Sequence, residues 1–200
     1  MKRRKKIKKE SKIHRIATVI SRVFDPFVTL GVVSVVAVLK SGLTGLPLLI
    51  FLFGIVFATI LLLLTLLHWA VKRGHITNWD LTNRRERIIP LFITIGILII
   101  DLLNARFFIN DFLVNLFILY IFFIIGIFLI TLFWKISGHS AGAMLASGVL
   151  FLWFGPVIWP VLLIVPVVGW ARVIRKDHTV SQVVAGVVYS IIILSFFYSK

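Results

Sequence analysis

The stretch Phe112–Phe133, FLVNLFILYIFFIIGIFLITLF, runs directly into Trp134–Met144, WKISGHSAGAM. The first stretch is almost wholly apolar, and about 20 helical residues suffice to cross the hydrocarbon core of a bilayer. In hydrocarbon, each backbone N–H and C=O must be satisfied within its own segment, which favours a helix. The second stretch interrupts the apolar pattern with Lys, Ser, Gly and His before another apolar run begins. Together they predict a transmembrane helix that ends in a polar junction at the membrane surface.

Apolar runs of this kind recur along the chain. Of its 200 residues, 60% are hydrophobic. We expect an all-α fold, a polytopic transmembrane helix bundle of about seven spans, with six possible because the third run is short and carries Asp101. The predicted spans are residues 23–39, 46–71, 89–105, 112–134, 141–155, 157–171 and 180–198. The expected organisation is a basic tail, residues 1–22, followed by a single transmembrane domain, residues 23–200.

The net charge of +15 is concentrated on one side of this predicted topology. Ten of the 22 Lys and Arg lie in residues 1–22. Nine more fall in connections on the same side. We expect a multi-pass protein of the cell membrane, and the positive-inside rule predicts that this side, with the N-terminus, faces the cytoplasm. The opposite side holds only Lys40, Arg106 and Lys200.

The basic tail is expected to lie against anionic lipid headgroups. It lacks interleaved aromatic residues and a recognition fold, so nucleic acid is not an expected partner. No small-residue cleavage site of a secretory signal follows it. The chain has no cysteine, which excludes disulfides and thiolate metal sites.

Three polar connections carry most of the remaining chemistry: Lys72–Pro90, Lys135–Gly142 and Ala171–Gly186. Because they alternate with helical hairpins, all three should emerge at the same membrane face. They contain several arginines, two histidines at span boundaries and a Ser-Gly pair ahead of a helix. Arginine forks match phosphate oxygens, and the free N–H groups at a helix start add further donors. Each element alone has an ordinary structural explanation, but together they suit a tetrahedral oxyanion.

These segments resemble the signature of the type 2 phosphatidic acid phosphatases, lipid phosphate phosphatases related to the vanadium haloperoxidases. The second element of that signature appears as Ile136-Ser137-Gly138-His139. The third appears as Ala171-Arg172, five residues, His178, three residues and Gln182. The first element is the loosest, because alignment of its arginine with Arg87 puts Ile88 at the proline and Asp80 at the lysine. The resemblance covers roughly residues 72–190.

The resemblance implies a role for each matched residue. His178 would be the nucleophile that forms a phosphohistidine, and His139 the general acid. The phosphoryl oxygens would be held by Arg172, Arg87, Ser137 and Gly138, with Arg84 or Arg85 in place of the missing lysine. Gln182 stands where the family has an aspartate, so it can orient His178 but brings no negative charge. Neither a metal nor another cofactor is implied.

The sequence therefore favours an integral membrane phosphatase that acts on a lipid phosphomonoester or a polyprenyl diphosphate. Its expected partners are this lipid substrate and the membrane bilayer. A catalytically degenerate relative that only binds lipid or phosphate remains the alternative. A transporter is disfavoured, because few ionisable residues fall inside spans and Asp101 is expected to pair with Arg106 at the far surface. Ser140 is expected to cap the helix that follows His139. Nothing in the sequence indicates an oligomeric state.

Overall fold

The structure is a computed structural model and describes residues 12–54, 61–77, 81 and 83–199. Within these residues the chain forms helices and their connections without any strand, so the all-helical prediction is confirmed. The helices are α1 (Lys12–Val23), α2 (Pro26–Lys40), α3 (Gly45–Gly54), α4 (Leu63–Lys72), the 3₁₀ helix η2 (Arg84–Arg87), α5 (Ile88–Phe107), α6 (Asp111–Phe133), α7 (Gly138–Phe154), the 3₁₀ helix η3 (Pro156–Leu163), α8 (Ile164–Ile174) and α9 (Val180–Tyr198).

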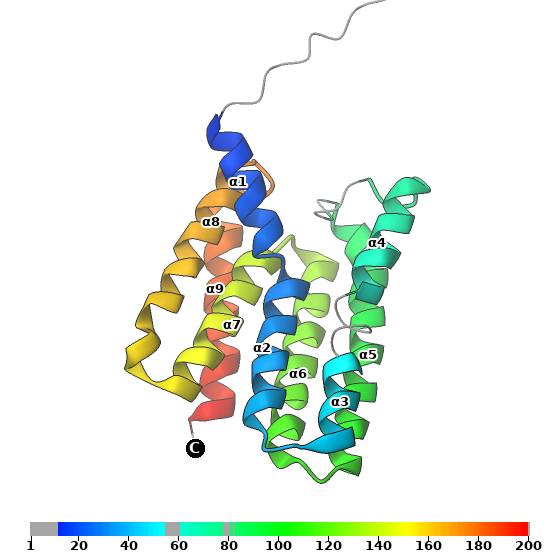
Figure 1. Cartoon of the computed structure of the whole chain (residues 1–200). Coiled ribbons are helices and arrows are strands. Elements are labelled where there is room, and N and C mark those ends of the chain that lie inside the picture. The colour runs from blue at the N-terminus through cyan, green and yellow to red at the C-terminus, as the bar shows by residue number, and fades with distance from the viewer. Residues whose placement is uncertain (1–11, 55–60, 78–80, 82, 200) are drawn as a thin grey trace, which may run out of the picture.

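The long helices lie side by side in one bundle (Figure 1). α7, α8 and α9 form one flank, α2 and α6 the middle, and α3, α4 and α5 the other flank. The most extensive contacts join α5 to α6 and α7 to α9, and α2 packs on α7. The C-terminus lies at the opposite end of the bundle from α1.

The predicted count of about seven spans is not confirmed. Among the described residues, four helical segments are long and apolar enough to cross a membrane: Arg84–Phe107, Asp111–Phe133, Pro156–Ile174 and Val180–Tyr198. A fifth arises if α1 and α2, which meet at a 42° bend, are one span. α3 and α7 are apolar but shorter. The apolar runs predicted the approximate positions of the helices, but they did not predict where each helix begins and ends. Residues 55–60 of the predicted second span lie outside the described residues.

The predicted tail contains a helix. Its residues 1–11 lie outside the described part, whereas Lys12–Val23 forms α1, which packs against α8. Ala17 and Ser21 are buried on its inner face. The helix then stops, and α2 begins after Asp25, with Pro26 in its first turn where a missing N–H costs nothing.

Two glycines let neighbouring helices touch the first turn of α7. A Cβ at Gly186 in α9 would lie 2.7 Å from the Ser137 carbonyl oxygen. A Cβ at Gly142 in α7 would lie 3.0 Å from Cβ of Pro26 in α2. The starts of α2, α7 and α9 are therefore held in direct contact by the absence of side chains at these positions.

We predict that Gly186→Ala destabilises the protein, because the new methyl group would overlap backbone that cannot rotate away. Overpacking of this kind costs about 1–3 kcal/mol, and the thermal midpoint of the detergent-solubilised protein should fall. Gly96→Ala in α5 is the matched control, since its Cβ would meet no atom within 4 Å. Equal midpoints for the two variants would contradict the close contact between α9 and α7.

Candidate functional site

The three polar connections meet at one end of the bundle. His178 follows α8, Gln182 lies in the first turn of α9, and Arg87 ends η2. The backbone N–H of Ser137 donates to the carbonyl oxygen of Gln182 over 3.1 Å, which ties the start of α7 to the start of α9. Segments about 40 to 90 residues apart in sequence thus form a single cluster.

His178 is held by both of its ring nitrogens. Nδ1 lies 3.0 Å from Oε1 of Gln182, and Nε2 lies 3.4 Å from Nη2 of Arg87. An amide oxygen can only accept, and an arginine can only donate. These contacts therefore favour the neutral tautomer with its proton on Nδ1 and its lone pair on Nε2. The Nε2 lone pair is the atom a nucleophilic histidine requires.

The capping of α9 fixes Gln182 in turn. Its Oε1 also accepts from the backbone N–H of Thr179 over 3.3 Å, while the Thr179 hydroxyl accepts from the backbone N–H of Gln182. This reciprocal pair is a capping box, in which two backbone donors at a helix start are satisfied at once. Gln182 thus orients His178 without the charge that an aspartate would bring.

The protonation of His178 is set by its surroundings. Burial, and after it the positive charges of Arg87 and Arg172, lower the pKa of His178 to about 3. The imidazole is therefore neutral at physiological pH when no anion is bound, so the lone pair on Nε2 is available without prior deprotonation.

Arg87 is anchored deep in the cluster. Only 7% of its surface is exposed. Nε donates to the carbonyl oxygen of Leu81 over 2.7 Å and Nη1 to that of Ile136 over 2.8 Å. Two of its nitrogens thus fix the guanidinium plane, and the third is aimed at His178.

Arg172 is fully buried beside Asp177. The Asp177 carboxylate oxygen Oδ2 lies 3.2 Å from Nη2 of Arg172 and 2.8 Å from Nε of Arg175. Although Asp177 precedes His178 in sequence, its side chain pairs with these two arginines. Gln182, not Asp177, therefore orients His178.

Lys135 is a cation of the site that the motif comparison missed. Its Nζ donates to the backbone carbonyl of Asp177 over 2.6 Å. Burial, followed by the nearby charge of Arg87, lowers the pKa of Lys135. Asp80, the position of the signature lysine, lies outside the described residues. The sequence feature that could have identified Lys135 as part of the candidate site is its position immediately before the Ile136–His139 element.

Arg84, expected to bind phosphate, is not brought into this cluster. It is exposed, and its Nη1 donates to the carbonyl oxygen of Phe133 at the end of α6 over 2.6 Å. This contact fastens η2 to α6, so Arg84 has a structural partner of its own. Lys135 is better placed than Arg84 to supply the missing lysine's charge.

Ser137 begins α7 as its cap. Its Oγ accepts from the backbone N–H of Ser140 over 3.3 Å. The expectation that Ser140 caps this helix is therefore wrong, because the extended backbone at residue 137 marks the helix boundary three residues earlier. His139 follows in the first turn, and only 7% of its surface is exposed. Its Nε2 lies 3.6 Å from Oδ2 of Asp25.

A small cavity lies beside Arg87 and His139, although His178 does not line it. Its volume is about 70 Å³, and its polar lining is Arg87, His139 and Asp25. A single water needs roughly 10–15 Å³ on this measure, so the cavity has room for a group of phosphoryl size. Gly138 lies on its wall and allows an anion to approach the backbone.

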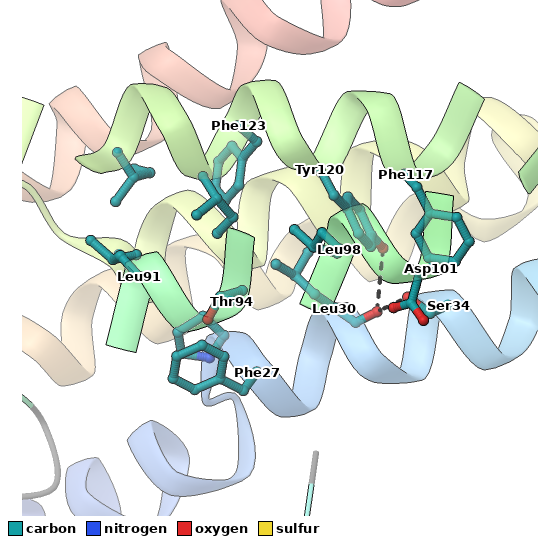
Figure 2. A pocket seen from close by; sticks show the side chains of 14 residues that line it. Phe27, Leu30, Ser34, Leu91, Thr94, Leu98, Asp101, Phe117, Tyr120 and Phe123 are labelled. Atoms are coloured by element: carbon teal, nitrogen blue, oxygen red, sulfur yellow. Dashed lines mark hydrogen bonds between the residues drawn. The ribbon is translucent and has the colours of Figure 1, made fainter. Parts of the chain in front are cut away.

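A second cavity adjoins the first and is almost wholly apolar (Figure 2). The two share Pro26, Phe27, Leu91, Ile127 and Gly138. The second extends between α2, α5 and α6 as far as Asp101 and Ser34. Asp101 is 5% exposed and lines this cavity. The expected pairing of Asp101 with Arg106 is not among the ion pairs of the described residues, and Arg106 is exposed.

Comparison with known families bears on the motifs. The model of the PAP2 superfamily matches residues 131–200, the part that contains the Ile136–His139 and Arg172–Gln182 elements. The resemblance is thus confirmed over residues 131–200, and the match is consistent with a PAP2 superfamily member. The match points to a phosphatase-type function, and the apolar helices point to a membrane protein. Neither the curated proteins nor the solved structures give a significant match. Among the described residues, no group of three His, Cys, Asp or Glu side chains could hold a metal ion.

We predict that phosphatase activity depends on the amide oxygen of Gln182. Gln182→Ala removes the acceptor for His178 Nδ1, and the loss of about 1.5 kcal/mol should lower kcat roughly tenfold. Gln182→Glu keeps an acceptor of the same length and adds a charge that favours the developing imidazolium, so its kcat should equal or exceed that of the wild type. A Glu variant as slow as the Ala variant would show that Gln182 has a different role.

Proposed function

We propose that this chain is an integral membrane phosphatase that hydrolyses a lipid phosphomonoester or a polyprenyl diphosphate through a phosphohistidine at His178. The observation that supports this most directly is the orientation of His178. Its Nε2 faces Arg87, while Nδ1 is occupied by Gln182. A neutral imidazole with a fixed lone pair beside a buried guanidinium is suited to attack phosphorus.

In the first step, Nε2 of His178 forms a bond to phosphorus as the bond from phosphorus to the leaving oxygen breaks. His139 donates a proton to that oxygen, so the alcohol leaves neutral. Arg87, Arg172 and Lys135, with the backbone at Ser137 and Gly138, would stabilise the charge on the phosphoryl oxygens. Gln182 accepts from Nδ1–H as positive charge develops on the imidazole.

In the second step, water attacks the phosphohistidine. His139, now neutral, takes a proton from the water, and the bond from phosphorus to Nε2 breaks. Inorganic phosphate leaves, and both histidines regain their starting protonation states. One phosphate ester and one water give one alcohol and one phosphate, whereas a polyprenyl diphosphate and one water give the polyprenyl monophosphate and one phosphate. No metal or other cofactor takes part.

The adjoining apolar cavity supports a substrate with a hydrocarbon tail. Leu91 and Ile127 line both cavities, so a phosphoryl group beside Arg87 would lie next to an apolar space between α2, α5 and α6. From Leu91 to Asp101 along α5 is about 15 Å at the helical rise. With a volume of about 70 Å³, the cavity would take the first part of such a tail.

We further propose that the site faces the cytoplasm. Arg172 and Arg175 lie at the C-terminal end of α8, and α8 packs against the basic helix α1. The positive-inside rule supports this orientation. Labelling of a cysteine at position 138 in intact cells would test it, and external labelling would contradict it.

The non-enzymatic alternative, a relative that only binds lipid or phosphate, has one observation in its favour. Gln182 lacks the charge that stabilises an imidazolium, and a carboxylate-to-amide change next to a catalytic histidine can be costly. The fixed tautomer of His178 weighs against this alternative.

We predict that the purified protein releases phosphate from lipid phosphates or polyprenyl diphosphates in the presence of a chelator. His178→Ala and His139→Ala should each lower release by at least a hundredfold, because nucleophile and acid are lost. Release should be measured over a panel of such lipids, with folding of each variant checked by gel filtration. Absence of release from any substrate by the folded wild type would favour the binding role.

We predict that filling the apolar cavity impairs turnover of long-chain substrates alone. Ser34→Leu and Leu98→Phe enter the cavity from α2 and α5, respectively. Each CH₂ group of the substrate tail that is excluded from the cavity loses about 0.8 kcal/mol of burial free energy. The kcat/KM for a lipid substrate should therefore fall tenfold or more.

The same two variants should hydrolyse a short-chain phosphomonoester at the wild-type rate. Leu39→Phe, at a 65% exposed position of α2, is the matched control. An equal loss on long and short substrates would place the tail elsewhere.

A further inference from the structure

Asp25 lies in the candidate site but belongs to none of the three sequence elements. It sits at the turn between α1 and α2, and it lines the first cavity with Arg87 and His139. Its Oδ2 is 3.6 Å from Nε2 of His139, and its side chain is 24% exposed. It brings a carboxylate within ion-pair distance of the proposed general acid.

The position of this carboxylate is fixed by the fold. Oδ1 accepts from the backbone N–H of Phe27 over 2.9 Å, so Asp25 caps α2. A helix N-terminus favours a negative charge. Pro26 packs against Gly142 in α7, in contact so close that a Cβ would not fit without displacement. The start of α2 is thereby pinned over the first turn of α7, beside His139.

His139 needs such a partner to act as an acid. Burial, and then the positive charge of Arg172, lower the pKa of His139 and so disfavour its imidazolium form. A general acid must carry a proton when the substrate binds. The bound phosphate supplies part of the compensating negative charge, but it leaves again as product.

We propose, on the basis of the function proposed above, that Asp25 is a positioning residue whose carboxylate holds His139 in its protonated, proton-donating state. The negative charge absent at Gln182, beside the nucleophile, is thus supplied beside the acid.

The proton balance of this step is simple. The His139 imidazolium gives its proton to the leaving oxygen as the bond from phosphorus to oxygen breaks, and becomes neutral. It regains a proton from the water that attacks the phosphohistidine. Asp25 stays ionised throughout and exchanges no proton with the substrate.

A role through the acid predicts a dependence on the leaving group. An alkoxide requires protonation as it departs, whereas a nitrophenolate leaves without it. Asp25→Asn keeps the cap, because Asn caps helices as well as Asp does, and removes only the charge. We expect kcat/KM for hexyl phosphate to fall at least tenfold more than for p-nitrophenyl phosphate.

The double variant separates the role of Asp25 from a structural one. In a His139→Ala background, Asp25→Asn should have no further effect on hexyl phosphate, because the residue through which it acts is gone. Asp111→Asn, which removes a carboxylate from the first turn of α6, is the control and should match the wild type on both esters.

Three results would overturn the inference. The first is an equal fall on both esters, and the second is an additive loss in the double variant. Both leave the proposed function intact, since the wild type is then active. The third is a folded wild type that hydrolyses neither ester nor any lipid phosphate, which would overturn the proposed function and the role of Asp25 with it.

Discussion

Buried positive charge is the constraint on which this structure depends. Arg172 is fully enclosed and Arg87 nearly so, with Lys135 and Arg175 close by. Charges removed from water are costly unless they are paired and hydrogen-bonded. Backbone carbonyls fix Arg87, and the carboxylate of Asp177 pairs with both Arg172 and Arg175. The basic side chains gathered here suit an anion such as a phosphoryl group.

The same local contacts that begin the helices also arrange the reactive groups. The capping box of α9 fixes the Gln182 amide oxygen, which in turn sets the tautomer of His178. The cap of α2 fixes Asp25 beside His139. Because each cap satisfies backbone donors that would otherwise be unmet, the site geometry is supported by the stability of the helices themselves.

Sequence patterns predicted the helical class and the approximate positions of the helices, because long apolar runs have few alternatives in lipid. They could not give the span count, since hydropathy does not show where α1 bends into α2 or that α7 is short. The spacing from Arg172 to His178 predicted which segments belong to the candidate site, and the structure brings these segments together. Lys135 and Asp25 were missed as site residues because their places depend on tertiary contacts. Arg84 was placed by sequence proximity to Arg87, yet its side chain points to Phe133.

The most direct test of the account is to trap the covalent intermediate. The protein would be mixed with a ³²P-labelled lipid phosphate, quenched in alkali within milliseconds to seconds, and digested for mass spectrometry. The account predicts an acid-labile, alkali-stable phosphate on the peptide that contains His178. The phosphate should be attached at Nε2, because Nδ1 is hydrogen-bonded to Oε1 of Gln182. Turnover without labelled protein, or label on another residue or on Nδ1, would contradict it.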